Sequence, residues 1–187
     1  MGKLFLVIGG ARSGKSDFAQ TLAERLSPDG KVLFVATAEA LDQEMERRIE
    51  AHKASRPPQW ETLEASTNVG KALMGKELPP VVVLDCITML VSNVLLAGGE
   101  SEPTEKALSR VDEEIEALLE TCRRSDSTWI VVTNEVGLGV VPASRLGRLF
   151  RDLLGRANKM LAAEADSVLW MVAGIPVDVK RLEWEPD

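Results

Sequence analysis

The sequence has few of the residues that build metal centres and disulfide frameworks. It contains 2 cysteines and 1 histidine among 187 residues. Cys86 and Cys122 are far apart and lack metal-ligand spacing, so neither a zinc site nor a disulfide framework is expected, and a reducing compartment fits this composition. The single histidine, His52, excludes a site built from several histidines.

An excess of basic charge is also missing. The chain has 22 Lys and Arg against 29 Asp and Glu, a net charge of −7. Because binding to a phosphate backbone needs a basic surface, we do not expect a nucleic-acid partner. The longest apolar run, Val81–Gly99, contains Asp85 and Asn93 and is better interpreted as a buried strand followed by an apolar helix than as a membrane span. The first ten residues are too short and glycine-rich for a signal peptide, so we expect a cytoplasmic protein without stable membrane insertion.

The pattern of apolar segments predicts an α/β fold. Short runs rich in β-branched residues alternate with helical patterns, and their continuous hydrophobicity is typical of strands covered on both faces. We expect a single P-loop nucleotide-binding domain over residues 1–187, an NTPase-like open, mainly parallel sheet with helices on both faces. After the turn signal at residues 174–176, alternating residues predict an antiparallel C-terminal edge strand or hairpin over Val177–Leu182. The predicted strands are Lys3–Ile8, Val32–Ala36, Val81–Cys86, Trp129–Thr133 and Val168–Ala173, and the predicted helices are Lys15–Leu26, Asp42–Ala54, Ile87–Leu96, Thr104–Arg123 and Ser144–Ala163.

A phosphate-binding loop follows the first predicted strand. The segment fits the pattern G-x-x-x-x-G-K-[ST] and consists of Gly9, Gly10, Ala11, Arg12, Ser13, Gly14, Lys15 and Ser16. The glycines let backbone N–H groups point at phosphate oxygens, and the following helix N-terminus adds partial positive charge. We expect Lys15 to reach the β- and γ-phosphates of a nucleoside triphosphate and Ser16 to bind Mg²⁺.

A second acidic element supports the phosphate loop. The apolar strand Val81–Cys86 carries Asp85 near its end, which is the usual form of a Walker B site. Asp85 is therefore a candidate Mg²⁺ ligand, either directly or through water. The alternative is a strand-end carboxylate that caps the next helix.

The only histidine lies on a predicted helix between two arginines. Met45, Ile49 and His52 fall at i, i+4 and i+7 and therefore share one helix face. Arg48 and Arg56 lie four positions before and after His52, so their positive charges favour its neutral, nucleophilic form. Each guanidinium could also donate two hydrogen bonds to a phosphoryl group. A half-buried histidine without chemistry remains the alternative interpretation.

Taken together, these segments resemble the bifunctional adenosylcobinamide kinase / adenosylcobinamide-phosphate guanylyltransferase family of cobalamin biosynthesis. The similarity spans nearly the whole chain, and the combined segments are far more specific than a P-loop alone. The matching segments are GGARSGKS at residues 9–16, VATA at 35–38, DQEMERRIEAHKASRP at 42–57, WETLE at 60–64, DCIT at 85–88, TNEVG at 133–137 and RLGRLFRDLLGRAN at 145–158.

The resemblance implies a two-step reaction. A nucleotide γ-phosphate, from ATP or GTP, passes to adenosylcobinamide. His52 then becomes guanylylated by GTP with loss of pyrophosphate, and adenosylcobinamide phosphate takes the GMP to give adenosylcobinamide-GDP. The resemblance also implies Mg²⁺ and a homotrimer. It assigns nucleotide contacts to Ala36, Thr37, Ala38, Ser55, Arg56, Pro57 and Glu64, and to Asp85, where the family more often has Glu.

Two other functions remain open at this stage. A P-loop kinase of another small hydroxyl substrate would keep the roles of Lys15 and Ser16 but would give His52 no covalent role. A GTP-binding switch would predict a guanine-specifying N-K-x-D motif, which the sequence does not contain.

Overall fold

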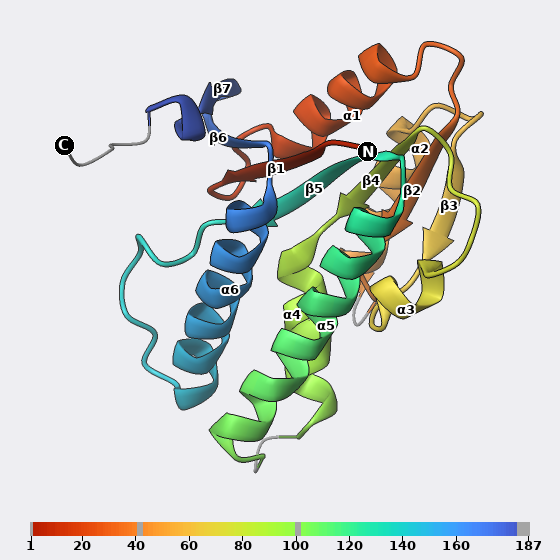
Figure 1. Ribbon diagram of the computed structural model, residues 1–187. Helices are drawn as coiled ribbons and strands as arrows, with labels where there is room; N and C mark the ends of the chain where they lie inside the picture. The colour runs from red at the N-terminus through yellow and green to blue at the C-terminus, as the bar shows by residue number, and fades with distance from the viewer. Residues whose placement is uncertain (1, 41–42, 100–101, 183–187) are drawn as a thin grey trace, which may run out of the picture.

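A seven-stranded sheet forms the centre of the computed structural model, which describes residues 2–40, 43–99 and 102–182 (Figure 1). The strand order is β3-β2-β4-β5-β1-β6-β7. All neighbouring pairs are parallel except β6 and β7, which are antiparallel. The strands are β1 (Leu4–Gly9), β2 (Val32–Ala36), β3 (Glu61–Glu64), β4 (Val81–Asp85), β5 (Thr128–Asn134), β6 (Ser167–Val172) and β7 (Ile175–Asp178). The predicted mainly parallel sheet with an antiparallel C-terminal edge is confirmed.

Helices cover both faces of this sheet (Figure 1). One face packs against α1 through Ala19 and Ala23, whereas the other packs against α3, α4, α5 and α6. The helices are α1 (Lys15–Leu26), α2 (Gln43–Ser55), α3 (Val69–Leu73), α4 (Ile87–Ala97), α5 (Thr104–Arg124) and α6 (Arg145–Glu164), and a 3₁₀ turn covers Val179–Leu182. The core is therefore divided into two apolar layers by the sheet.

The continuous apolar runs are explained by this two-sided burial. In β1, Leu6 belongs to the layer under α4–α6, while the next residue, Val7, belongs to the layer under α1. Leu84 and Val83 of β4 divide in the same way. Since successive strand residues point to opposite faces, every position of a central strand has to be apolar.

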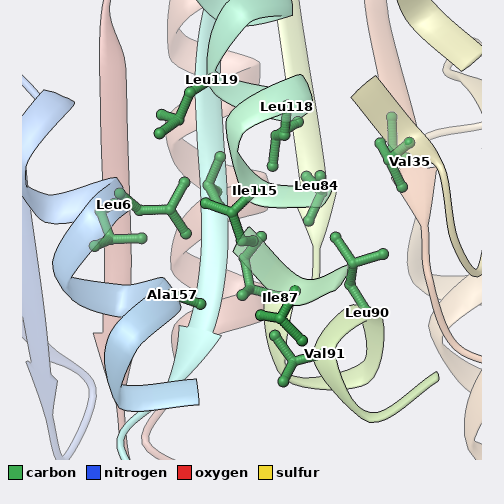
Figure 2. Packing of buried hydrophobic residues seen from close by; sticks show 14 of the residues in the cluster. Leu6, Val35, Leu84, Ile87, Leu90, Val91, Ile115, Leu118, Leu119 and Ala157 are labelled. Atoms are coloured by element: carbon green, nitrogen blue, oxygen red, sulfur yellow. The ribbon is translucent and has the colours of Figure 1, made fainter. Parts of the chain in front are cut away.

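The apolar stripe of α5 forms much of the larger layer. Ile115, Leu118 and Leu119 are almost fully buried and lie over Leu6 and Leu84 of the sheet (Figure 2). Full burial of one such side chain contributes about 1.5–3 kcal/mol of transfer free energy. The sheet and α5 thus support the loops that follow the carboxyl ends of the strands.

A buried carboxylate on α5 explains how the short helix α3 begins. The two oxygens of Glu114 accept hydrogen bonds from the backbone N–H groups of Asn68 and Val69, each at 2.8 Å. These are two of the N–H groups that the first turn of a helix leaves without partners. Glu114 therefore fixes the segment that joins β3 to β4.

The structure corrects the predicted elements at two short elements and at the C-terminal strand. The elements β3 and α3 were not predicted, because four and five residues carry little periodicity. The C-terminal strand runs from Ile175 to Asp178 rather than from Val177 to Leu182, and Val179–Leu182 form the 3₁₀ turn. Pro176 is tolerated within β7 because this strand lies at the sheet edge. The helix predicted from Asp42 is described from Gln43 onward, and Asp42 itself lies outside the described residues.

The Val81–Gly99 run divides into β4 and α4, as predicted. Within the described ranges, no helix combines the length and apolar character that a membrane crossing requires.

Candidate active site

The phosphate loop occupies the predicted turn between β1 and α1, and its glycines are needed at two points. Gly14 has a φ of 88°, in the left-handed region that disfavours other residues. A Cβ added to Gly9 would lie 2.7 Å from the carbonyl oxygen of Met171, which is too close for a real contact. On the far side of the loop, the N–H of Gly174 in the β6–β7 turn donates to the carbonyl oxygen of Ser13 at 3.0 Å. The loop is therefore held on both sides by the rest of the protein.

Lys15 is folded back into the loop. Its side chain is buried, and its Nζ donates to the carbonyl oxygen of Gly10 at 2.5 Å and to the hydroxyl of Ser13 at 3.4 Å. Burial lowers the pKa of Lys15, and the negative charge of Asp85 opposes this shift. An incompletely solvated cation inside a ring of backbone groups is well suited to an anionic partner such as a phosphate.

A cavity of about 890 Å³ opens beside this loop. Its walls come from the loop and the start of α1, the ends of β2 and β4, the segment after β3, and one side of α2. The predicted site residues that line the cavity are Ala11, Arg12, Ser16, Ala36, Ala38, His52, Arg56, Glu64 and Asp85. The structure therefore gathers residues from the whole first half of the chain around one space.

The other predicted site residues are not part of this lining. Gly9, Gly10, Ser13, Gly14 and Lys15 belong to the adjoining phosphate loop, and Thr37, Ser55 and Pro57 lie next to residues that do line the cavity. The hydroxyl of Thr37 is committed to the protein, since it donates to the carbonyl oxygen of Cys86 at 2.7 Å and accepts from its N–H at 2.8 Å. The Ser55 hydroxyl donates to the carbonyl oxygen of His52 at 3.0 Å.

The predicted common face of α2 is confirmed, and it faces the cavity. Met45, Ile49 and His52 all contribute to the lining. Met45 and Ile49 are half-buried, whereas His52 is exposed. The imidazole therefore shares a cavity with Ser16 of the phosphate loop and is accessible from it.

Arg56, just after α2, carries buried hydrogen-bond donors without acceptors. Its guanidinium carbon lies 3.6 Å from the centre of the Phe34 ring, and this ring stacks on Trp60 with the centroids 6.4 Å apart. Its Nε and Nη1 are buried and have no hydrogen-bond partner in the described part of the chain. Burial lowers the pKa of Arg56, while the charges of Asp85 and Glu64 oppose this shift. A buried donor normally has a partner, so this guanidinium is suited to an anion in the cavity.

Glu64 at the end of β3 forms an ion pair with Lys53 of α2. The hydrogen bond that Lys53 donates to Glu64 and the positive charge of Lys53 both lower the pKa of Glu64. Its carboxylate is therefore ionised at neutral pH and bridges two walls of the cavity. Lys53 and Phe34 were not predicted as site residues. Lys53 lies in the matching segment at residues 42–57 but received no role, Phe34 belongs to no motif, and their place in the site depends on how α2 lies against the sheet.

The oxygen donors in the cavity fit a magnesium ion bound together with phosphate. Ser16 is the second residue of α1 and Asp85 ends β4, and both side chains belong to the cavity lining. Across residues 2–40, 43–99 and 102–182, no group of three or more His, Cys, Asp or Glu could hold a metal by itself. Mg²⁺ commonly takes only one or two protein oxygens and completes its shell with water and phosphate, so this sparse set is appropriate. Burial raises the pKa of Cys86 to about 12, so its thiol is neutral and is no competing ligand.

The fold and this site define a P-loop enzyme. A solved structure of an ATPase domain has a similar fold, with a TM-score of 0.50 at 13% identity; the match covers 90% of this chain and 68% of that one. Residues 5–179 match the family described as cobinamide kinase / cobinamide phosphate guanyltransferase, and the chain belongs to this family.

Curated relatives agree over almost their full length. The bifunctional adenosylcobalamin biosynthesis protein CobU of Salmonella typhimurium is 44% identical over 95% of this chain and 99% of its own. The Escherichia coli protein of the same name is 42% identical with the same coverage. The protein CobP of Pseudomonas aeruginosa is 40% identical over 94% of this chain and 96% of its own. The resemblance inferred from the sequence motifs is confirmed.

Proposed function

We propose that this enzyme phosphorylates adenosylcobinamide with ATP or GTP and then transfers GMP from GTP, through a guanylylated His52, to adenosylcobinamide phosphate. The products of the second reaction are adenosylcobinamide-GDP and pyrophosphate. The observation that carries the proposal is that the one histidine, the phosphate loop and the unpartnered guanidinium of Arg56 adjoin one cavity in the described part of the chain.

In the kinase step the phosphate loop holds the triphosphate. Its backbone N–H groups and the N-terminus of α1 surround the phosphates, and Lys15 exchanges its contacts with Gly10 and Ser13 for phosphate oxygens. Ser16 and Asp85 would hold Mg²⁺, which when bound neutralises charge on the phosphates. The substrate hydroxyl attacks the γ-phosphorus, the bond to the nucleoside diphosphate oxygen breaks, and the hydroxyl proton passes to solvent. The protein contributes positioning and charge neutralisation.

In the second step a neutral imidazole nitrogen of His52 attacks the α-phosphorus of GTP. A phosphorus–nitrogen bond forms, the bond to pyrophosphate breaks, and the other ring nitrogen can release its proton. The buried Nε and Nη1 donors of Arg56 then have an acceptor in the attacked phosphate. A phosphate oxygen of adenosylcobinamide phosphate next attacks the same phosphorus. The phosphorus–nitrogen bond breaks, and a ring nitrogen takes a proton back from solvent, which restores neutral His52.

The base lies against the walls formed by the ends of β2 and β3 in this proposal. Ala36 and Ala38 leave room for a planar ring, with Thr37 between them held rigid by its bonds to Cys86. The ionised carboxylate of Glu64 can accept from the N1–H and N2–H₂ donors of guanine, once the base competes with Lys53 for it. Ser55 at the end of α2 and the following Arg56 and Pro57 adjoin this space, and Asp85 closes the floor.

We further propose that the enzyme is a cytoplasmic homotrimer, on the basis of the family resemblance and the scarcity of cysteine.

The test is the intact-protein mass after incubation with GTP and Mg²⁺. We expect a GMP adduct on the wild type that is acid-labile and alkali-stable, and no adduct on His52→Ala. A matched control is Glu50→Ala, an exposed change on the same helix outside the cavity lining, which should label like the wild type. Absence of an adduct from wild-type protein that binds GTP would overturn the covalent mechanism and favour a P-loop kinase without a covalent intermediate.

A further inference from the structure

An isolated amide is buried in the apolar helix α4. The helix has the sequence ITMLVSNVLLA, and its Asn93 is only 8% exposed. The side-chain Nδ2 donates to the carbonyl oxygen of Thr37 at 2.8 Å and to that of Ser66 at 3.0 Å. A buried polar group normally stabilises a protein only when it is satisfied, and here both N–H donors of the amide are used.

The two acceptors belong to two different walls of the cavity. Thr37 follows β2 and lies between Ala36 and Ala38, which line the cavity. Ser66 follows β3 and itself lines the cavity, two residues after Glu64. One planar amide therefore joins the segment after β2 to the segment after β3. It acts one residue beyond the backbone hydrogen bond that Ala65 donates to the carbonyl oxygen of Ala36 at 2.9 Å, so it helps to set the separation of the two segments.

The bonds at Thr37 extend this connection to the floor of the cavity. The N–H of Thr37 donates to the carbonyl oxygen of Asp85 at 3.3 Å, and its hydroxyl exchanges two hydrogen bonds with Cys86. Removing the Asn93 amide would leave two carbonyl groups without this donor. Since an unsatisfied buried carbonyl group is unfavourable, we expect the walls to separate and admit water or other donors.

We propose that Asn93 is a positioning residue for base selection in the GMP-transfer step: by tying Thr37 to Ser66, it helps to set the width of the slot that prefers guanine to adenine. This inference rests on the proposed function, which assigns the two walls to the base. Asn93 is absent from the cavity lining and acts through the backbone of its two acceptors.

The experiment compares binding of GDP and ADP to Asn93→Leu by calorimetric titration, together with steady-state GMP transfer. Leucine keeps the branched shape and the number of heavy atoms of asparagine, although it is larger, and it has no donor. We expect the dissociation constant for GDP to rise about tenfold and that for ADP much less, so that base discrimination falls. We expect KM for GTP to rise with kcat nearly unchanged, because wall spacing affects binding of the base rather than the reacting phosphate.

A second buried hydrogen-bond donor provides the matched control. The hydroxyl of Thr121 in α5 donates to the carbonyl oxygen of Gly70 at 2.9 Å, and neither residue lines the cavity. Thr121→Val should lower the thermal midpoint but leave the GDP-to-ADP ratio unchanged. If Asn93→Leu does not fold, Asn93→Ser, which keeps one donor, should give an intermediate loss of discrimination.

Two outcomes separate this inference from the proposed function. If Asn93→Leu is destabilised like Thr121→Val but keeps the wild-type GDP-to-ADP ratio and KM, the positioning role is wrong. If wild-type protein gives no His52 adduct but Asn93→Leu loses base discrimination, the covalent mechanism fails and the role of Asn93 stands.

Discussion

The helices α5 and α2 differ in what their apolar residues contact. In α5, 7 of 21 residues are buried, and its apolar stripe packs on the sheet (Figure 2). In α2, none of the side chains that the structure describes is buried, and the face that carries Met45, Ile49 and His52 borders the cavity. Both helices have an apolar stripe in sequence, but only that of α5 contributes to the core.

This difference shows how one fold separates stability from chemistry. Helix α5 holds the sheet and also caps α3 through Glu114. Near the C-terminal end of α2, Lys53 pairs with Glu64 and the following Arg56 stacks on Phe34. A helix with few buried contacts can carry a reactive group at little cost in stability, because its residues are not required by the core.

The largest effect is expected from truncation in α5. Leu118→Ala removes a fully buried side chain, so we expect the free energy of unfolding to fall by about 2–5 kcal/mol. The same type of change on α2, Ile49→Ala, should cost less than about 1 kcal/mol because Ile49 borders the cavity. Chemical denaturation of both variants measures the contrast, and equal losses would show that α2 is a core helix.

The next effect is on activity alone. Arg56→Lys keeps the positive charge but loses the planar set of donors, so we expect the rate of His52 guanylylation to fall about 100-fold. Stability should fall by no more than about 1 kcal/mol, through the altered cation–π contact with Phe34, because the buried Nε and Nη1 have no acceptor in the described part of the chain. Single-turnover labelling with GTP measures the rate. Arg123→Lys on α5, at an exposed cluster with Glu116, Glu120 and Glu164, serves as the control and should retain the wild-type rate.

The smallest of the three effects is a pH dependence of the free energy of unfolding, which we expect from Cys122 in α5. Burial raises the pKa of Cys122 to about 12 from the ordinary value of 9.0. The unfolded chain therefore loses its thiol proton at a lower pH than the folded chain, and the stabilisation present below pH 9 is lost as the pH rises toward 12. This one group contributes a slope of at most about 1.4 kcal/mol per pH unit.

Denaturation curves between about pH 8 and about pH 11 test this sign. Cys122→Ala should show a shallower decline than the wild type across this interval, whatever its stability at neutral pH. An identical slope in both proteins would mean that the thiol does not titrate differently in the folded and unfolded states.

The long elements could be predicted from sequence because their periodicity reports burial directly. A continuous apolar run such as that of β1 or β4 is typical of a strand buried on both faces, and the apolar stripe of α5 is typical of a helix packed on one side. The P-loop is recognised by its fixed spacing. The elements β3 and α3 were missed because their positions depend on contacts such as the Glu114 cap, which joins residues 46 positions apart. The bounds of β7 were predicted wrongly because Pro176 indicates a turn unless the strand is known to lie at the edge of the sheet.

The residues of the candidate site that belong to motifs could be predicted from the sequence. Those whose role depends on packing could not. His52, Ser16 and Asp85 were identified from local patterns, and they adjoin one cavity. Asn93 was not identified, although a single amide in a mainly apolar helix is a usable signal. Its meaning depends on which carbonyl groups it meets, and these are 56 and 27 residues away. No local pattern contains that information.

The bond between Gly174 and Ser13 links distant segments of the chain and affects when the site can form during synthesis. A ribosome makes the phosphate loop long before it makes the turn that holds the far side of this loop. The strand β6, which pairs with β1, is equally late. Contacts between such distant segments form slowly, so the nascent chain carries its nucleotide motif in an incomplete state until the β6–β7 hairpin docks. We therefore expect the nascent chain to bind nucleotide tightly only after this hairpin has been made and has folded.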